Sequence, residues 1–208
     1  MNSVRRFFLL AGLSVAMLAG CSDKPADATA TGFSGIDITG ADYATGFSLT
    51  DHNGQPRTLA DFKGKAVVVF FGFTQCPDVC PTSLGELAQA RQLLGADGER
   101  LQGLFISVDP ERDTPARLGE YVHAFHKDTL AATADIPSLE RFATSLGFVF
   151  QKVPGKHFDE NPEDYTLEHS ASLAVLDPQG RLAGLVRPPF NAPAIARDLQ
   201  KLTEKSAP

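Results

Sequence analysis

Short apolar runs alternate with helical periodicities through most of this chain. Runs of β-branched and aromatic residues, such as the one from Val67 to Phe71, are typical of strands covered on both faces. The predicted elements are, in chain order, a hairpin over 47–59, a strand at 66–71, a helix over 81–95, a strand at 104–108, helices over 115–125 and 139–146, strands at 148–153, 171–176 and 182–186, and a helix over 192–202. This order predicts an α/β domain with a mixed central sheet.

Turn and capping residues place several of these boundaries. The residues from Asp51 to Gly54 predict the turn of the N-terminal hairpin. Thr114 and Pro115 predict a helix start with proline at the first position, and Ser138 is the expected N-cap of the third helix. A polar loop over 154–167 is expected before the strand at 171–176.

The chain begins with a short apolar segment, residues 1–20, of the secretory type. Arg5 and Arg6 form a basic start, and the residues from Phe7 to Gly20 carry no charge. This stretch is shorter than the roughly 20 residues that a bilayer core needs, but it is typical of a signal peptide. Small residues directly precede Cys21, as in a bacterial lipobox, so we expect cleavage before Cys21 and lipid on that cysteine. The alternative is an ordinary signal peptide, or an uncleaved anchor, with an incidental cysteine.

Composition divides the remainder into a tether and one domain. Residues 21–44 are expected to be the lipidated cysteine and a flexible tether, because large apolar residues are scarce there, and the globular domain is expected over 45–205. Removal of residues 1–20 would change the formal net charge from −6 to −8. No basic run is present, so the sequence does not indicate nucleic-acid binding. We expect a protein that faces the periplasm and is held at a membrane by its lipid, with inner and outer membrane both open.

Two cysteines, Cys76 and Cys80, follow the first buried strand where a helix begins. A thiol at a helix N-terminus has a lowered pKa, since the positive end of the helix dipole favours the thiolate. On the first helical turns, positions i and i+4 would bring the two Cα atoms to roughly 6 Å, which fits a disulfide. The same pair could hold a soft metal ion. With a dithiol at this junction, the domain resembles a thioredoxin fold with an added N-terminal β-hairpin and an inserted loop before the histidine-bearing strand.

One of the five histidines is placed to join this pair. His169 precedes the strand at 171–176, which in a thioredoxin-like sheet would start beside the dithiol. Thioredoxin-type oxidoreductases carry a cis-proline there, but no proline occurs between Pro162 and Pro178. His169 is therefore a candidate metal ligand. The other four are expected to be solvated surface residues: His52, His123, His126 and His157.

Three motifs in order resemble the Sco/SenC family of copper-binding assembly proteins. They are the segment from Cys76 to Pro81, the segment SVDPERDTP over 107–115, and the segment from Tyr165 to Ser170. The resemblance covers about 45–202 and implies copper bound by both cysteines and His169. Glu168 stands where family members often carry Asp, which should leave the ligand intact.

The donor set also favours copper on chemical grounds. Two thiolates and an imidazole suit Cu(I), whereas a structural zinc site would need a fourth protein ligand. We expect both Cu(I) and Cu(II) to be bound. Asp78 and Asp109 are candidates to support the ligands from the same sheet edge, or else a helix-start charge and a turn residue. The run from Glu111 to Asp113 is expected to be a solvated loop.

The resemblance implies a copper metallochaperone that acts on the dinuclear copper centre of cytochrome c oxidase subunit II, or on another periplasmic copper protein. The enzymatic alternative is a thiol–disulfide oxidoreductase that reduces the cysteines of that centre, because a low-pKa dithiol also exchanges disulfides. A copper or redox sensor is a third possibility. The CxxxC spacing and the missing proline weaken general disulfide exchange, so a non-enzymatic role is favoured.

Overall fold

The computed structural model describes residues 36–41 and 47–204. The predicted signal segment and Cys21 lie outside these residues. The strands are β1 (Ile36–Ala41), β2 (Leu49–Asp51), β3 (Pro56–Arg57), β4 (Ala66–Gly72), β5 (Leu101–Ser107), β6 (Leu130–Thr133), β7 (Phe150–Pro154), β8 (Tyr165–His169), β9 (Leu173–Leu176) and β10 (Leu182–Val186). The α-helices are α1 (Val79–Leu94), α2 (Pro115–His123), α3 (Ile136–Ser145) and α4 (Ala192–Glu204), and the 3₁₀ helices are η1 (Leu59–Phe62) and η2 (Gly95–Arg100).

A mixed eight-stranded sheet forms the centre, in the order β1-β10-β9-β4-β5-β6-β2-β3. β4 pairs in parallel with β5 and antiparallel with β9. Every residue of β4 is buried, as its unbroken apolar run predicts. Full burial of one Val or Phe side chain contributes about 1.5–3 kcal/mol, so the burial of β4 contributes strongly to the stability of the sheet. The predicted α/β architecture with a mixed sheet is confirmed.

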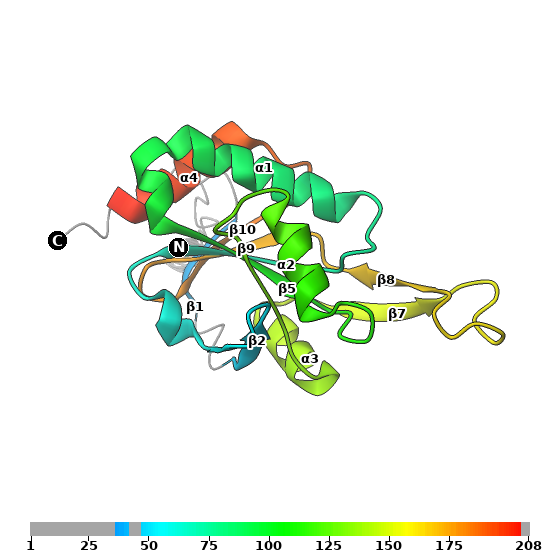
Figure 1. The fold of residues 1–208 in the computed structure, drawn as a ribbon. Coiled ribbons are helices and arrows are strands. Elements are labelled where there is room, and N and C mark those ends of the chain that lie inside the picture. Colours follow the sequence, from blue (N-terminus) through cyan, green and yellow to red (C-terminus); the bar gives the residue numbers. More distant parts are fainter. Residues whose placement is uncertain (1–35, 42–46, 205–208) are drawn as a thin grey trace, which may run out of the picture. The chain divides into compact units, whose positions relative to one another are not determined.

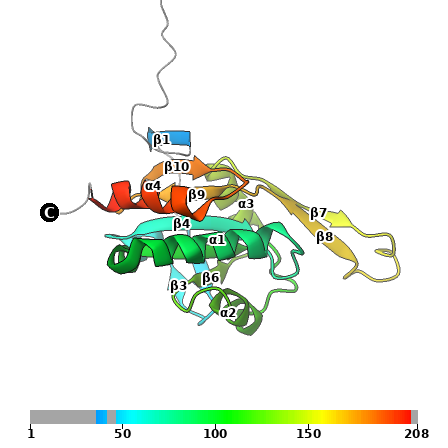
Figure 2. The ribbon, with the colours of Figure 1, turned by 90° about the horizontal axis from the view of Figure 1, so that it is seen from above.

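Helices cover both faces of this sheet. Figure 1 shows α1 and α4 on one face and α3 on the other. Seen from above in Figure 2, α1 and α4 lie side by side, in agreement with their extensive mutual contact. On the α3 face, the rings of Phe71 and Phe142 lie 5.4 Å apart between centroids. On the face covered by α1, Phe105 packs against Tyr121 of α2 at 5.5 Å.

Two helix starts test the capping predictions. Thr114 caps α2 and accepts a hydrogen bond from the Arg117 amide, with Pro115 as the first helical residue, as expected. The expectation for Ser138 is wrong. α3 begins earlier, and its N-cap is Asp135, whose carboxylate accepts the Ser138 amide at 2.7 Å. Ser138 is thus inside the first turn, where its amide needs an acceptor.

The polar loop predicted over 154–167 is partly a strand. Residues 165–169 form β8, which pairs antiparallel with β7 in a separate two-stranded sheet. His169 is the last residue of β8, opposite Phe150, and does not simply precede β9. Figure 1 shows this β-hairpin projecting from one side of the central sheet. The insertion before β9 is therefore a hairpin with the loop 155–164 at its tip.

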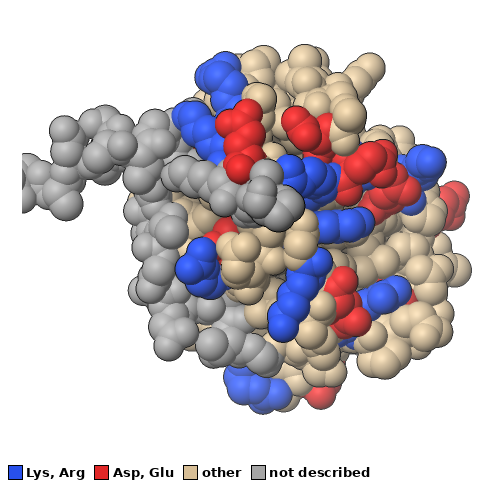
Figure 3. Space-filling model, turned by 90° about the vertical axis from the view of Figure 1, so that its left-hand side faces the viewer, with Lys and Arg blue, Asp and Glu red and all other residues tan. Residues whose placement is uncertain are grey.

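Other differences concern short edge elements. β6 was not predicted, because it has only four residues and no marked alternation. Residues 36–41, within the segment expected to be a tether, form β1 and pair with β10. No helix in the described part of the chain is long and apolar enough to cross a membrane. On the face drawn in Figure 3, the described Lys and Arg side chains are interspersed with Asp and Glu.

Candidate metal site

The first cysteine lies in the turn that connects β4 to α1. The Cys76 amide donates to the Phe73 carbonyl at 3.2 Å, and α1 begins only at Val79. The expectation that both cysteines lie on the first helical turns is therefore wrong for Cys76. Its sulfur instead accepts the Cys80 amide at 3.4 Å. Since the N-cap residue Asp78 makes no side-chain cap bond, Cys76 Sγ takes the position of an N-cap acceptor.

The second cysteine is the second residue of α1 and is fully buried, at 0% exposure. Its sulfur lies against the backbone of Gly72, the last residue of β4. A Cβ atom at Gly72 would be 2.8 Å from Cys80 Sγ and 2.7 Å from the Phe105 ring. Glycine is therefore required at the strand end so that the sulfur can lie against the sheet.

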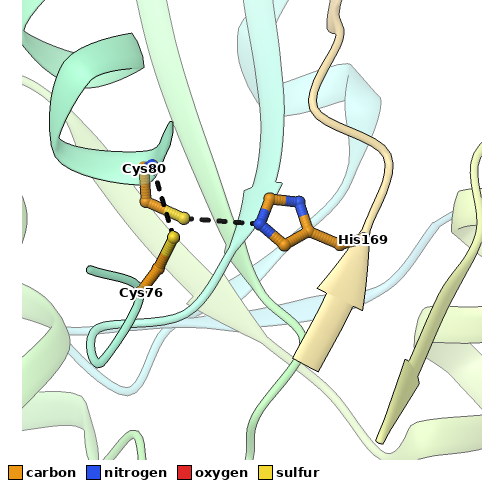
Figure 4. A group of neighbouring side chains, drawn as sticks. All are labelled: Cys76, Cys80 and His169. Atoms are coloured by element: carbon orange, nitrogen blue, oxygen red, sulfur yellow. Dashed lines mark hydrogen bonds between the residues drawn. The ribbon is translucent and has the colours of Figure 1, made fainter. Parts of the chain in front are cut away.

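The histidine reaches the dithiol from the end of β8. Its Nε2 atom is 3.5 Å from Cys80 Sγ (Figure 4). Its Nδ1 atom is 3.1 Å from the Ser170 carbonyl oxygen. A carbonyl can only accept, so Nδ1 carries the proton in this arrangement and Nε2 presents a lone pair toward the sulfurs. Phe70 and Phe73 meet the imidazole edge-on, with centroids 5.8 and 6.0 Å away. The ring is thus held in the orientation that a ligand needs.

The three side chains form one compact donor group. Their possible ligand atoms, two sulfurs and one nitrogen, all lie within 4.8 Å of one another. No other group of three His, Cys, Asp or Glu side chains within the described residues is close enough to share an ion. Both cysteines are free thiols in this structure. Sulfur and imidazole donors are the set that soft metal ions prefer.

The two thiols titrate as a coupled pair. The Cys80 S–H donates to the Cys76 sulfur, which lowers the pKa of Cys76 to about 4 against the opposing effect of burial; the amides of Asp78 and Cys80 assist. The same bond, together with burial, raises the pKa of Cys80 strongly. One proton is therefore retained on Cys80 while Cys76 is the thiolate.

The remaining predicted residues lie outside the donor group. Asp78 is exposed, and its side chain makes no cap bond. Asp109 is buried at the end of β5, where Arg112 Nε donates to it at 2.6 Å and the Tyr165 hydroxyl at 2.7 Å. Asp109 therefore interacts with the β8 strand and not with either sulfur. None of the other four histidines belongs to the group.

Of the segment from Glu111 to Asp113, only Glu111 is solvated as expected. Asp113 is only 2% exposed and accepts three hydrogen bonds, from the Thr74 amide, the Thr74 hydroxyl and the Ser107 hydroxyl. Arg112 is mostly buried, with its guanidinium carbon 3.6 Å from the Tyr165 ring centroid. The motif over 107–115 contains Arg112 and Asp113, but the polar character of these side chains gives no indication in the sequence that they are buried.

Known proteins resemble this chain in both sequence and fold. A family model described as SCO1/SenC matches residues 37–204. A relative from Stutzerimonas stutzeri is 36% identical over 157 residues, which are 75% of this chain and 74% of that protein. The mitochondrial protein SCO2 homolog of Mus musculus is 38% identical over 136 residues, or 64% of this chain and 52% of its own length. The structure of Bradyrhizobium japonicum ScoI with copper bound has 37% identity and a TM-score of 0.67, over 75% of this chain and 96% of that one.

The fold and site therefore define a thioredoxin-like domain with a Cys₂His donor group. The chain belongs to the SCO1/SenC family. It spans about half the length of the mitochondrial relative, at 52%. The described residues contain one cis peptide bond, between Pro188 and Pro189, so the position before β9 has no cis-proline.

We expect the reduced, metal-free chain to keep one thiolate at neutral pH. Because the pKa of Cys76 is lowered to about 4, the ultraviolet absorbance of a thiolate should persist at pH values above it and disappear as the pH falls through it. Cys80→Ala removes the S–H donor, so this transition should move upward toward the ordinary thiol pKa of about 8.5. Cys76→Ser should abolish it. A wild-type transition in the alkaline range, with circular dichroism showing an intact fold, would contradict the assignment.

Proposed function

We propose that this protein binds one copper ion through Cys76, Cys80 and His169 and delivers it to the dinuclear copper centre of cytochrome c oxidase subunit II, or to another periplasmic copper protein. The single observation that carries the proposal is the convergence of two sulfurs and one imidazole nitrogen within 4.8 Å. Family membership supports the metal, since a relative with 37% identity has been solved with copper bound.

The donor chemistry fits this cargo. Cu(I) accepts two or three soft ligands. Once Cys80 releases its proton, two thiolates and one imidazole are available to bind it. Binding therefore releases a proton and is favoured as the pH rises. Structural zinc sites use four protein ligands, and the described residues bring only three together.

The site is open on the side of His169, which a transfer step requires. The imidazole is partly exposed, whereas Cys80 is fully buried. A cavity of about 350 Å³ lies beside it, and its lining includes Phe150 and the highly exposed Val149. A recipient protein would reach His169 from this cavity, which neither cysteine lines, so His169 is the ligand that it would replace first.

A thiol–disulfide exchange activity is the second candidate, because the thiols are already coupled. The Cys76 thiolate would attack one sulfur of a partner's disulfide and expel the other as a thiolate. Cys80 would then lose its proton and attack Cys76 in the mixed disulfide. This releases a second partner thiolate and leaves a Cys76–Cys80 disulfide. A copper or redox sensor would use the same groups and needs a signalling partner as well.

The proposal includes attachment to a membrane on its periplasmic side through lipid on Cys21. Its support is the uncharged stretch from Phe7 to Gly20 and the small residues before the cysteine. Such an anchor would hold the described domain at the membrane surface, where a membrane-bound recipient of copper could be reached.

We predict that His169→Ala separates metal delivery from disulfide exchange. Loss of the imidazole leaves a two-coordinate dithiolate, which Cu(I) tolerates better than Cu(II) does. Cu(II) affinity should fall by about 100-fold or more, because loss of an outer partner alone costs about 10–100-fold, while Cu(I) affinity should fall less. The measurements are competition titrations with chelators for each oxidation state. His157→Ala, an exposed histidine at the hairpin tip, is the matched control and should bind copper normally.

Oxidase assembly in cells decides between the two activities. If the protein delivers copper, His169→Ala should abolish assembly as completely as Cys76→Ala does. If the protein acts as a reductase, the variant keeps both thiols and should retain much of its assembly activity when copper is supplied. Near-normal oxidase activity of His169→Ala at limiting copper would overturn the delivery proposal.

The lipid assignment has its own test. Labelled palmitate should be incorporated into the full-length protein and be lost in Cys21→Ser, because only that cysteine receives lipid. Cys80→Ala, which removes a thiol elsewhere, should keep the label. Recovery of the unlabelled wild-type protein in the soluble periplasmic fraction would contradict the anchor.

A further inference from the structure

The donor group is assembled from two parts of the molecule that do not share a sheet. The cysteines follow β4 of the central sheet, whereas His169 ends β8 of the separate β7–β8 hairpin. Among the described residues, no backbone ladder joins the hairpin to the central sheet, and residues 170–172 connect His169 to β9. Side-chain contacts therefore add to this short link in holding the histidine at its distance from the sulfurs.

One set of contacts fixes the start of β8. The Tyr165 hydroxyl donates to buried Asp109 at 2.7 Å, and Arg112 Nε donates to the same carboxylate at 2.6 Å. The Arg112 guanidinium also covers the Tyr165 ring and donates through Nη1 to the Tyr165 carbonyl at 3.0 Å. Tyr165 is the first residue of the strand that His169 ends. Charged partners and burial make these bonds stronger than ordinary surface contacts.

A second set fixes the turn that carries Cys76. Asp113 accepts the Thr74 hydroxyl and the Ser107 hydroxyl, each at 2.6 Å, and the Thr74 amide at 3.0 Å. Thr74 is two residues before Cys76, and Ser107 is the last residue of β5. The carboxylate thus ties the cysteine turn to the end of the central sheet.

The two sets share one turn of backbone. The amides of Arg112 and Asp113 both donate to the Asp109 carbonyl, at 3.2 and 2.9 Å. The cysteine turn and the start of β8 are therefore joined through a single rigid segment, 109–113. We call Asp109, Arg112 and Asp113, with their partners Thr74 and Tyr165, the bracket.

We propose that the bracket sets the position of His169 relative to the two sulfurs, so that Asp109 and Asp113 act on copper through Tyr165 and Thr74 and not as ligands. This inference rests on the proposed copper site. The bracket has two arms: the contacts of Tyr165 with Asp109 and Arg112 form the Tyr165 arm, and the contacts of Thr74 with Asp113 form the Thr74 arm. Cu(II) depends on the imidazole more than Cu(I) does, so the Tyr165 arm affects Cu(II) binding most. The Thr74 arm places the sulfur of Cys76 and acts on both oxidation states.

Tyr165→Phe tests the first arm, since it deletes one hydroxyl and keeps the ring beneath Arg112. Cu(II) affinity should fall about 10-fold, the lower end of the effect of losing an outer partner, with a smaller change for Cu(I). In a His169→Ala background the same substitution should have no further effect on copper affinity. A purely structural role would give an equal loss in both backgrounds, and that result would overturn the inference.

Thr74→Val tests the second arm and keeps the backbone amide that donates to Asp113. Affinity for both ions should fall by a similar factor, with or without His169. The matched control is Arg181→Gln, which removes a donor, 2.8 Å away, from the buried Asp177 in the β9–β10 turn. It should lower thermal stability without changing copper affinity. Copper affinities of Thr74→Val equal to those of wild type would overturn the second arm.

An NMR measurement on the protein without copper tests the bracket independently of whether the protein binds copper. In the reduced protein, Tyr165→Phe should shift the imidazole NMR resonances of His169, while Arg181→Gln should leave them unchanged. This result holds even if the wild type proves not to bind copper. Unchanged His169 resonances in Tyr165→Phe would contradict the bracket directly.

Discussion

The approach of Cys80 Sγ to His169 Nε2, at 3.5 Å, is the contact on which the whole site depends. It joins a helix of the central domain to the end of a hairpin that belongs to another sheet. On one side, Gly72 allows the sulfur to lie against the strand end. On the other, the Ser170 carbonyl fixes the proton on Nδ1, so the remaining nitrogen faces the sulfur with a lone pair. Neither side chain would be useful alone, because a single soft donor holds a metal ion weakly.

The same arrangement explains how one site can serve metal binding and redox chemistry. The shared proton makes Cys76 a thiolate, which is the species that binds soft metals and attacks disulfides. Oxidation of the pair would consume both sulfur ligands, so copper and the disulfide exclude one another. His169 adds a ligand to the metal form and nothing to the exchange step. The histidine is therefore what distinguishes this donor group from a simple dithiol.

The sequence was sufficient for the central architecture, which depends on strong local patterns. The grouping of His169 with the two cysteines was reached through the resemblance to a thioredoxin fold and to the Sco/SenC family, because 89 residues separate His169 from Cys80. The buried run before Gly72 and the glycine and proline punctuation are visible without coordinates. The β8 strand was missed because Glu168 and Thr166 are exposed and give it a polar composition. The burial of Asp113 could not be predicted, since its partner Thr74 is 39 residues away. The placement of Cys76 on a helical turn was wrong, because α1 begins at Val79, after Cys76 and slightly before the predicted helix start at 81. The burial of Asp113 depends on tertiary hydrogen bonds, which local propensity does not encode, whereas the errors at Cys76 and Ser138 concern local bonds at helix starts.

Copper X-ray absorption spectroscopy on the reduced full chain, loaded with one equivalent of Cu(I), tests the central claim most directly. The spectrum reports which atoms surround the ion without depending on transfer, oxidase assembly or membrane attachment. The account predicts a shell of two sulfur atoms and one imidazole nitrogen, since these three atoms converge in the structure. A shell that contains sulfur alone, or only oxygen and nitrogen, would contradict it.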